Sequence, residues 1–183
     1  MKHLVTLILA ALLLAGCEKK PAETSGSWAQ FAETAGMAPD QVGQRAPDFD
    51  YVLLEGQTGR LSDHQGKLVF LNFWATWCLP CKKEMPDIEE LSSLMKGKPF
   101  VILAVSSGEG AEKVSLYHKK FPYSFPFAMD ADGAISAKYE VNLLPSTFLI
   151  SPEGEIIGKA IGPRHWSADE FINQLEGLLP KER

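Results

Sequence analysis

Two cysteines separated by two residues, Cys78 and Cys81, are the side chains whose type and spacing most clearly predict chemistry in this 183-residue chain. Residues 67–74 form an apolar run that predicts a strand buried on both faces, and the apolar spacing that follows predicts a helix over 78–95. At the start of a helix, unpaired N–H groups and the helix dipole favour a thiolate. Cys78 is therefore the predicted nucleophile toward a partner disulfide, and Cys81, one turn further on, is predicted to be more buried and to resolve the mixed disulfide.

Other interpretations of this cysteine pair remain open. A structural disulfide is one, although a bridge across so short a loop constrains the unfolded chain little. Half of a zinc site is another, but it needs two more ligands, and His64, His118 and His165 show no paired spacing. A binding module with idle cysteines is the third. We expect redox chemistry, with no metal and no cofactor other than the Cys78–Cys81 disulfide itself.

The first 17 residues predict export from a bacterial cytoplasm. A basic start at residues 2–3 precedes an apolar run over residues 4–15, which is too short for a membrane-spanning helix, since that needs about 20 apolar residues. The run ends in Leu14-Ala15-Gly16-Cys17, which resembles a bacterial lipobox and predicts that Cys17 becomes the lipidated first residue of the mature protein. An ordinary signal peptide with an incidental Cys17 is the alternative. Lipidation would use the odd one of the three cysteines.

Residues 18–38 are rich in small, polar and charged side chains, with two isolated aromatics, Trp28 and Phe31. This composition predicts a flexible tether with one short helical turn at 27–35. Residues 39–183 have the size of one ordinary domain. The whole chain has 18 basic and 23 acidic residues and no dense Lys/Arg cluster, which excludes nucleic acid as the partner.

The domain alternates segments that predict strands and helices, as is typical of an α/β fold with a central mixed sheet flanked by helices. Residues 48–54 and 57–61 predict an N-terminal β-hairpin. Further helices are expected at 111–121, 134–139 and 167–179, and further strands at 100–106, 125–129, 146–150 and 155–161. Ser167 and Glu170 have the spacing of a capping box at the start of the last helix.

Two motifs of this chain resemble a known family. The run from Asn72 to Pro86 reads NFWATWCLPCKKEMP and is similar to the active-site segment of thioredoxins and, more narrowly, of the TlpA/ResA-like extracytoplasmic group. The run from Tyr139 to Thr147 reads YEVNLLPST and resembles the family segment that ends in a cis-proline. The resemblance covers about residues 40–180. It implies a thioredoxin-like fold with an N-terminal β-hairpin and an extra strand and helix inserted before the cis-proline, Pro145.

The resemblance also implies roles for residues around the cysteines. Pro145 would be cis and packed against them, and the backbone of Leu144 would pair with a partner strand and present its disulfide to the nucleophile. Trp77 would be an apolar platform beside the nucleophile, with a role as a core aromatic as the alternative. Leu79 and Pro80, the two residues between the cysteines, would help set the reduction potential.

One position departs from the thioredoxin pattern. Thioredoxins place a buried Asp six residues before the first cysteine, where this chain has Asn72, whose amide cannot titrate. Glu84 lies three residues after Cys81 and therefore on the same helix face. In the ResA-like group a Glu at this place is an active-site acid, and burial would raise its pKa enough to exchange a proton with a thiol. A solvated surface charge is the alternative interpretation of Glu84.

These features together predict a monomeric, membrane-anchored thiol-disulfide oxidoreductase that reduces disulfides of exported proteins, among them apocytochromes awaiting haem attachment. The expected partners are those proteins, a membrane electron donor of the thiol type, and the lipid bilayer through Cys17. The expected location is the periplasm or the outer cell surface. An oxidant that inserts disulfides and a carrier that binds metal or haem through its thiols are the alternatives.

Overall fold

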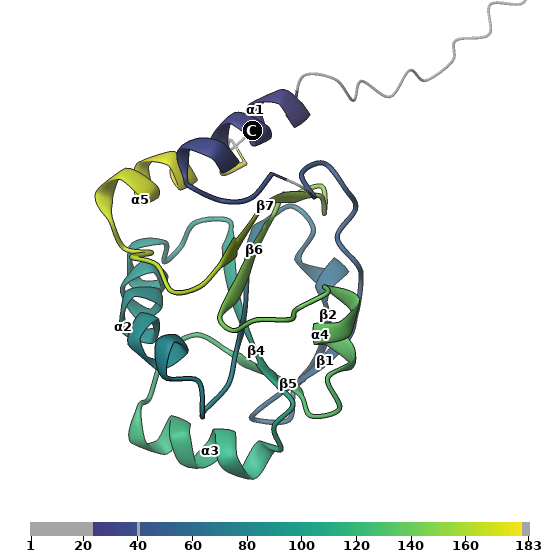
Figure 1. The fold of residues 1–183 in the computed structure, drawn as a ribbon, viewed down its shortest axis with the longest axis vertical. Helices are drawn as coiled ribbons and strands as arrows, with labels where there is room; N and C mark the ends of the chain where they lie inside the picture. Colours follow the sequence, from purple (N-terminus) through teal and green to yellow (C-terminus); the bar gives the residue numbers. More distant parts are fainter. Residues whose placement is uncertain (1–23, 40, 181–183) are drawn as a thin grey trace, which may run out of the picture.

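The computed structural model, which describes residues 24–39 and 41–180, is built on a seven-stranded mixed β-sheet (Figure 1). The strands lie in the order β2-β1-β5-β4-β3-β6-β7. Their bounds are β1 (Asp50–Leu53), β2 (Thr58–Arg60), β3 (Leu68–Trp74), β4 (Phe100–Ser107), β5 (Phe127–Asp130), β6 (Ser146–Ile150) and β7 (Ile156–Ile161). Strands β3, β4 and β5 are parallel, whereas β6 runs antiparallel to β3 and β1 antiparallel to β5. The α/β fold, the hairpin of β1 and β2, and the expected strands are thereby confirmed.

Five α-helices and one 3-10 turn surround the sheet in the described residues (Figure 1). They are α1 (Thr24–Thr34), the 3-10 turn (Leu61–His64), α2 (Leu79–Leu94), α3 (Ala111–Lys120), α4 (Ala134–Lys138) and α5 (Asp169–Glu176). The extra pair expected before the cis-proline corresponds to β5 and α4. None of the described helices is long and apolar enough to cross a membrane.

The central strand β3 is buried at every position, as its continuous apolar run predicts. Its residues alternate between two cores because successive side chains of a strand point to opposite faces. Phe70 and Trp74 pack in a cluster that joins α1, α2, α3 and α5, and Leu71 and Phe73 pack in a cluster with β1 and α4. Because β3 is covered on both faces, it holds the segment that follows Trp74 in a fixed position.

Helix α1 corrects the prediction of a flexible tether over residues 18–38. Within its described part this segment is a helix of three turns whose Trp28, Phe31 and Ala32 are buried. The helix packs on β7. A Cβ at Gly158 of β7 would lie 3.1 Å from the Cβ of Met37, so this glycine gives room to the segment that follows the helix. The spacing of Trp28, Phe31, Ala32 and Ala35 is that of one apolar helix face. The folded unit therefore begins before residue 39.

The start of the last helix also differs from the prediction. Helix α5 begins at Asp169 with Ala168 as its N-cap, and no side chain caps it. The capping box expected from Ser167 and Glu170 is wrong because the chain makes another turn at this point, in which the Ala168 N–H donates to the His165 carbonyl at 3.4 Å. That turn shifts the helix start by one residue and takes Ser167 out of the cap position.

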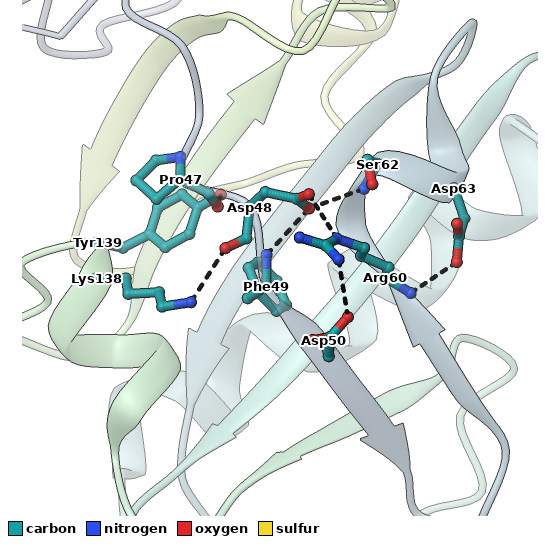
Figure 2. Close-up of polar contacts among 9 residues, drawn as sticks. All are labelled: Pro47, Asp48, Phe49, Asp50, Arg60, Ser62, Asp63, Lys138 and Tyr139. Atoms are coloured by element: carbon teal, nitrogen blue, oxygen red, sulfur yellow. Dashed lines mark hydrogen bonds and ion pairs between the residues drawn. The ribbon is translucent and has the colours of Figure 1, made fainter.

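A polar network fixes the segment before β1 to α4 (Figure 2). Arg60 Nε donates to Asp48 at 2.7 Å, Lys138 Nζ donates to the Asp48 carbonyl at 3.1 Å, and the Tyr139 hydroxyl donates to the Pro47 carbonyl at 2.8 Å. Tyr139 then packs edge-on against Phe49, with ring centroids 5.8 Å apart. Because the loop after α4 leads to the cis-proline, this network helps to fix where that loop begins.

Candidate active site

The cysteine pair lies where β3 ends and α2 begins, and it forms a disulfide. Cys78 is the N-cap of α2, and its Sγ accepts a hydrogen bond from the backbone N–H of Cys81 at 3.2 Å. Pro80 occupies the first turn, where a missing N–H costs nothing. Both cysteines are buried, Cys81 completely so. The predicted strand–helix junction and the order of burial are confirmed, and the sulfur of Cys78 lies where backbone donors favour a negative charge.

Two exposed apolar side chains flank Cys78 in sequence, and a third lies in the loop before the cis-proline. Trp77 is 67% exposed and Leu79 is 60% exposed, which rules out the alternative interpretation of Trp77 as a core aromatic. Leu143, in the loop before the cis-proline, is 63% exposed. Exposed apolar side chains beside a reactive sulfur, such as Trp77 and Leu79, can receive an apolar part of another chain. Sequence reasoning did not find Leu143, which carries no signal apart from its place beside Leu144.

The loop before β6 has the conformation that the family motif implies. The Leu144–Pro145 peptide bond is cis, and Pro145 is buried. Ser146, the next residue, pairs with Phe73 of β3, so the loop and the strand end that precedes the cysteines lie at the same edge of the sheet. Neither the N–H nor the C=O of Leu144 has a hydrogen-bond partner among the residues that the structure describes. Both groups can therefore pair with an extended chain.

Glu84 is a buried acid on the same face of α2 as Cys81, with 2% of its surface exposed. Its Oε1 accepts from Asn72 Nδ2 at 3.0 Å, and its Oε2 accepts from Trp166 Nε1 at 3.0 Å and from the Arg164 N–H at 3.2 Å. Burial raises the pKa of the Glu84 carboxyl from its ordinary value of 4.5 to about 7, although the three hydrogen bonds act in the opposite direction. The interpretation of Glu84 as a solvated charge is wrong.

A second buried acid, Glu109, holds the turn before Cys78. Its two oxygens accept from the Thr76 N–H and from the Thr76 hydroxyl, both at 2.6 Å. The Cys78 N–H donates to the Ala75 carbonyl at 3.1 Å and closes the same turn. Glu109 was not found from the sequence, because it follows β4 and lies 33 residues from its partner. It shows that the disulfide lies at the end of the sheet where α3 begins.

The predicted lipidation site and the predicted absence of a metal both stay predictions. Cys17 and the expected signal peptide lie outside the described residues. In the described part of the chain, no three His, Cys, Asp or Glu side chains gather in a group that could hold a metal ion.

Comparisons with known proteins agree with this geometry. The AhpC/TSA family matches residues 42–159. The thiol-disulfide oxidoreductase ResA of Geobacillus kaustophilus is 40% identical over 150 residues, which are 82% of this chain and 83% of that protein. ResA of Bacillus subtilis is 40% identical over 128 residues, which are 70% of this chain and 72% of that protein.

Solved structures give the same result. A putative thiol:disulfide interchange protein DsbE from Chlorobium tepidum superposes with a TM-score of 0.69 at 30% identity and covers 75% of this chain and 97% of that one. The pneumococcal exposed lipoprotein thioredoxin Etrx1 from Streptococcus pneumoniae has a TM-score of 0.63 at 32% identity, over 73% of this chain and 100% of that one. The expected thioredoxin-like fold is confirmed.

Proposed function

The chain belongs to the AhpC/TSA family as a ResA-like thiol-disulfide oxidoreductase, and from this premise we propose that it is a membrane-anchored reductase of disulfides in exported proteins. The observation that carries the proposal is the disulfide at the N-cap of α2, with a buried acid of raised pKa one helical turn beyond Cys81. A structural bridge needs no such acid, whereas thiol exchange needs a group that takes up the proton of the resolving thiol.

The reaction begins with both cysteines reduced. The Cys78 thiolate attacks one sulfur of the partner disulfide, which forms a mixed disulfide and releases the other partner sulfur as a thiolate. Glu84 takes the proton of Cys81, and the Cys81 thiolate attacks the Cys78 sulfur. This step closes the Cys78–Cys81 disulfide and releases the second partner thiol, so two electrons pass to the partner. A thiol donor at the membrane then reduces the disulfide again.

The partner chain binds through its backbone and its apolar side chains. The free N–H and C=O of Leu144 pair with an extended segment on the partner, and Trp77 and Leu143 contact its apolar side chains. Leu79 and Pro80 lie between the two cysteines in sequence and act on the reduction potential. Apocytochromes with a disulfide between their two haem-attachment cysteines are the proposed substrate class within exported proteins.

The anchor in this proposal is a lipidated Cys17. Helices α1 and α3 lie at opposite ends of the molecule (Figure 1), and Glu109 places the disulfide near the start of α3. The redox site lies at the end of the molecule away from α1, the helix that would follow the anchor in this proposal. Changing Cys17→Ala should move the protein from the membrane fraction to the soluble fraction, and a protein that stays in the membrane would contradict the anchor.

Reduction of insulin disulfides tests the activity, and the reduction potential tests its direction. We expect the wild type to reduce insulin and the Cys78→Ser variant to be inactive. Equal activity of the two would refute the assignment of Cys78. A potential near about −270 mV indicates a reductant, whereas a value near about −120 mV would make the protein an oxidant that inserts disulfides.

A further inference from the structure

The two oxygens of the Glu84 carboxyl have unequal surroundings. Oε2 accepts two N–H donors from the segment between β7 and α5, the Trp166 indole at 3.0 Å and the Arg164 backbone at 3.2 Å. Oε1 accepts one bond, from Asn72 Nδ2 at 3.0 Å. An indole N–H and a backbone N–H can only donate. A proton on Oε2 would therefore face two groups that cannot accept it.

Asn72 can offer Oε1 a hydrogen-bond acceptor, which Oε2 lacks. The Asn72 side chain is completely buried, and its Oδ1 has no hydrogen-bond partner among the described residues. Its Nδ2 also donates to the Thr147 hydroxyl at 2.9 Å. If the amide turns by 180°, Oδ1 comes to lie between Glu84 Oε1 and Thr147 Oγ1 and can accept a hydrogen bond from each. Asn72 can thus donate a hydrogen bond to the ionised carboxylate of Glu84 and accept one from the protonated carboxyl.

Trp166 is held firmly in this place. Its ring is buried, and it packs edge-on against Phe70, with ring centroids 5.0 Å apart, and against Phe171 at 5.1 Å. Phe171 in turn contacts Phe31 of α1 at 6.5 Å. Because these contacts come from β3, α5 and α1, the indole N–H cannot turn away from Glu84 without disturbing the core.

We infer that Trp166 is a positioning residue, which together with the backbone N–H of Arg164 reserves Oε2 of Glu84 as an acceptor and leaves Oε1 as the oxygen that takes up and releases the proton. This inference rests on the proposed function, in which Glu84 exchanges a proton with Cys81. The other titratable groups near Glu84 are Asp87 on α2, whose charge raises the pKa of Glu84, and His165, whose Nδ1 lies 3.1 Å from Asp87 Oδ2. The side chain of Arg164 is the third, and its Nε is buried without a hydrogen-bond partner among the described residues. Strands β3 and β6 present only the uncharged Asn72 and Thr147.

The test is the titration of the Glu84 carboxyl carbon, followed by ¹³C NMR in the full-length oxidised protein and assigned by its loss in Glu84→Gln. Trp166→Phe keeps an aromatic ring but removes the donor to the ionised carboxylate, so the midpoint should rise by about one pH unit. Trp74→Phe is the matched control, because Trp74 is equally buried but its Nε1 has no partner in the described residues. It should leave the midpoint unchanged.

An unchanged midpoint in Trp166→Phe, or an equal rise in Trp74→Phe, would overturn the inference. Neutron diffraction of the wild type at about pH 5, below the midpoint, needs no variant and should show a deuteron on Oε1 of Glu84. A deuteron on Oε2 would also overturn it. Neither measurement depends on turnover, so a failure here is distinct from a failure of the Cys78→Ser test, which concerns the oxidoreductase activity itself.

Discussion

The raised pKa of Glu84 predicts a pH-dependent cost to stability that Glu84→Gln removes. Folding raises the pKa from 4.5 to about 7, so the folded state holds this proton more tightly than the unfolded state. The stabilising effect of proton binding is fully present below about pH 4.5 and is lost as the pH rises through about 7. The change in pKa corresponds to about 3 kcal/mol in total, of which roughly 2.5 kcal/mol falls between pH 5 and pH 8.

Urea unfolding of the oxidised protein measures this cost, because neither disulfide-bonded cysteine titrates in that state. The free energy of unfolding of Glu84→Gln minus that of the wild type should grow by roughly 2.5 kcal/mol from pH 5 to pH 8. The subtraction cancels other titrating groups and any pH-independent effect of the amide. A difference that stays constant within about 0.5 kcal/mol over this range would refute the argument that Glu84 is held in a site that opposes its charge.

Three further predictions concern single side chains. Phe31→Ala should lower the free energy of unfolding by about 3 kcal/mol, since Phe31 is buried against the domain; a loss below about 0.5 kcal/mol in urea unfolding would mean that α1 does not pack. Glu140, at the end of α4, has φ +51°, so Glu140→Gly should stabilise the protein by about 1 kcal/mol whereas Glu140→Ala should not; equal melting temperatures for the two variants would contradict this. Glu109→Ala leaves two Thr76 donors without their acceptor and should cost about 2 kcal/mol, and a melting temperature equal to that of the wild type would show that Glu109 does not hold the turn.

The elements that position the disulfide could be predicted from local sequence, but the contacts that act on the nearby Glu84 carboxyl could not. Strand β3 is an unbroken apolar run, and the helix after it has Met85, Ile88 and Leu91 at helical spacing. Trp166, by contrast, lies 82 residues from Glu84, and nothing near it in sequence marks it as the donor. Contacts of this kind depend on how β7 and α5 approach α2, which no periodic pattern encodes.

Helix α1 illustrates a different limit. Its buried face, with Trp28, Phe31 and Ala32, has the spacing of an amphipathic helix. The polar and small residues between them have the composition of a tether, so the sequence predicted only one short helical turn, at 27–35, within a flexible segment. The decisive contact is tertiary, because the apolar face of α1 is buried by packing on β7, which lies far away in the sequence.

Mapping the mixed disulfide tests whether Cys78 is the attacking sulfur. The reduced Cys81→Ser and Cys78→Ser variants are each mixed with a peptide that contains a disulfide, and the adduct is located by mass spectrometry. We predict an adduct on Cys78 in Cys81→Ser and much slower adduct formation in Cys78→Ser, because only Cys78 lies at the N-cap of α2. No adduct on Cys78, or an equally fast adduct on Cys81, would contradict the proposed mechanism.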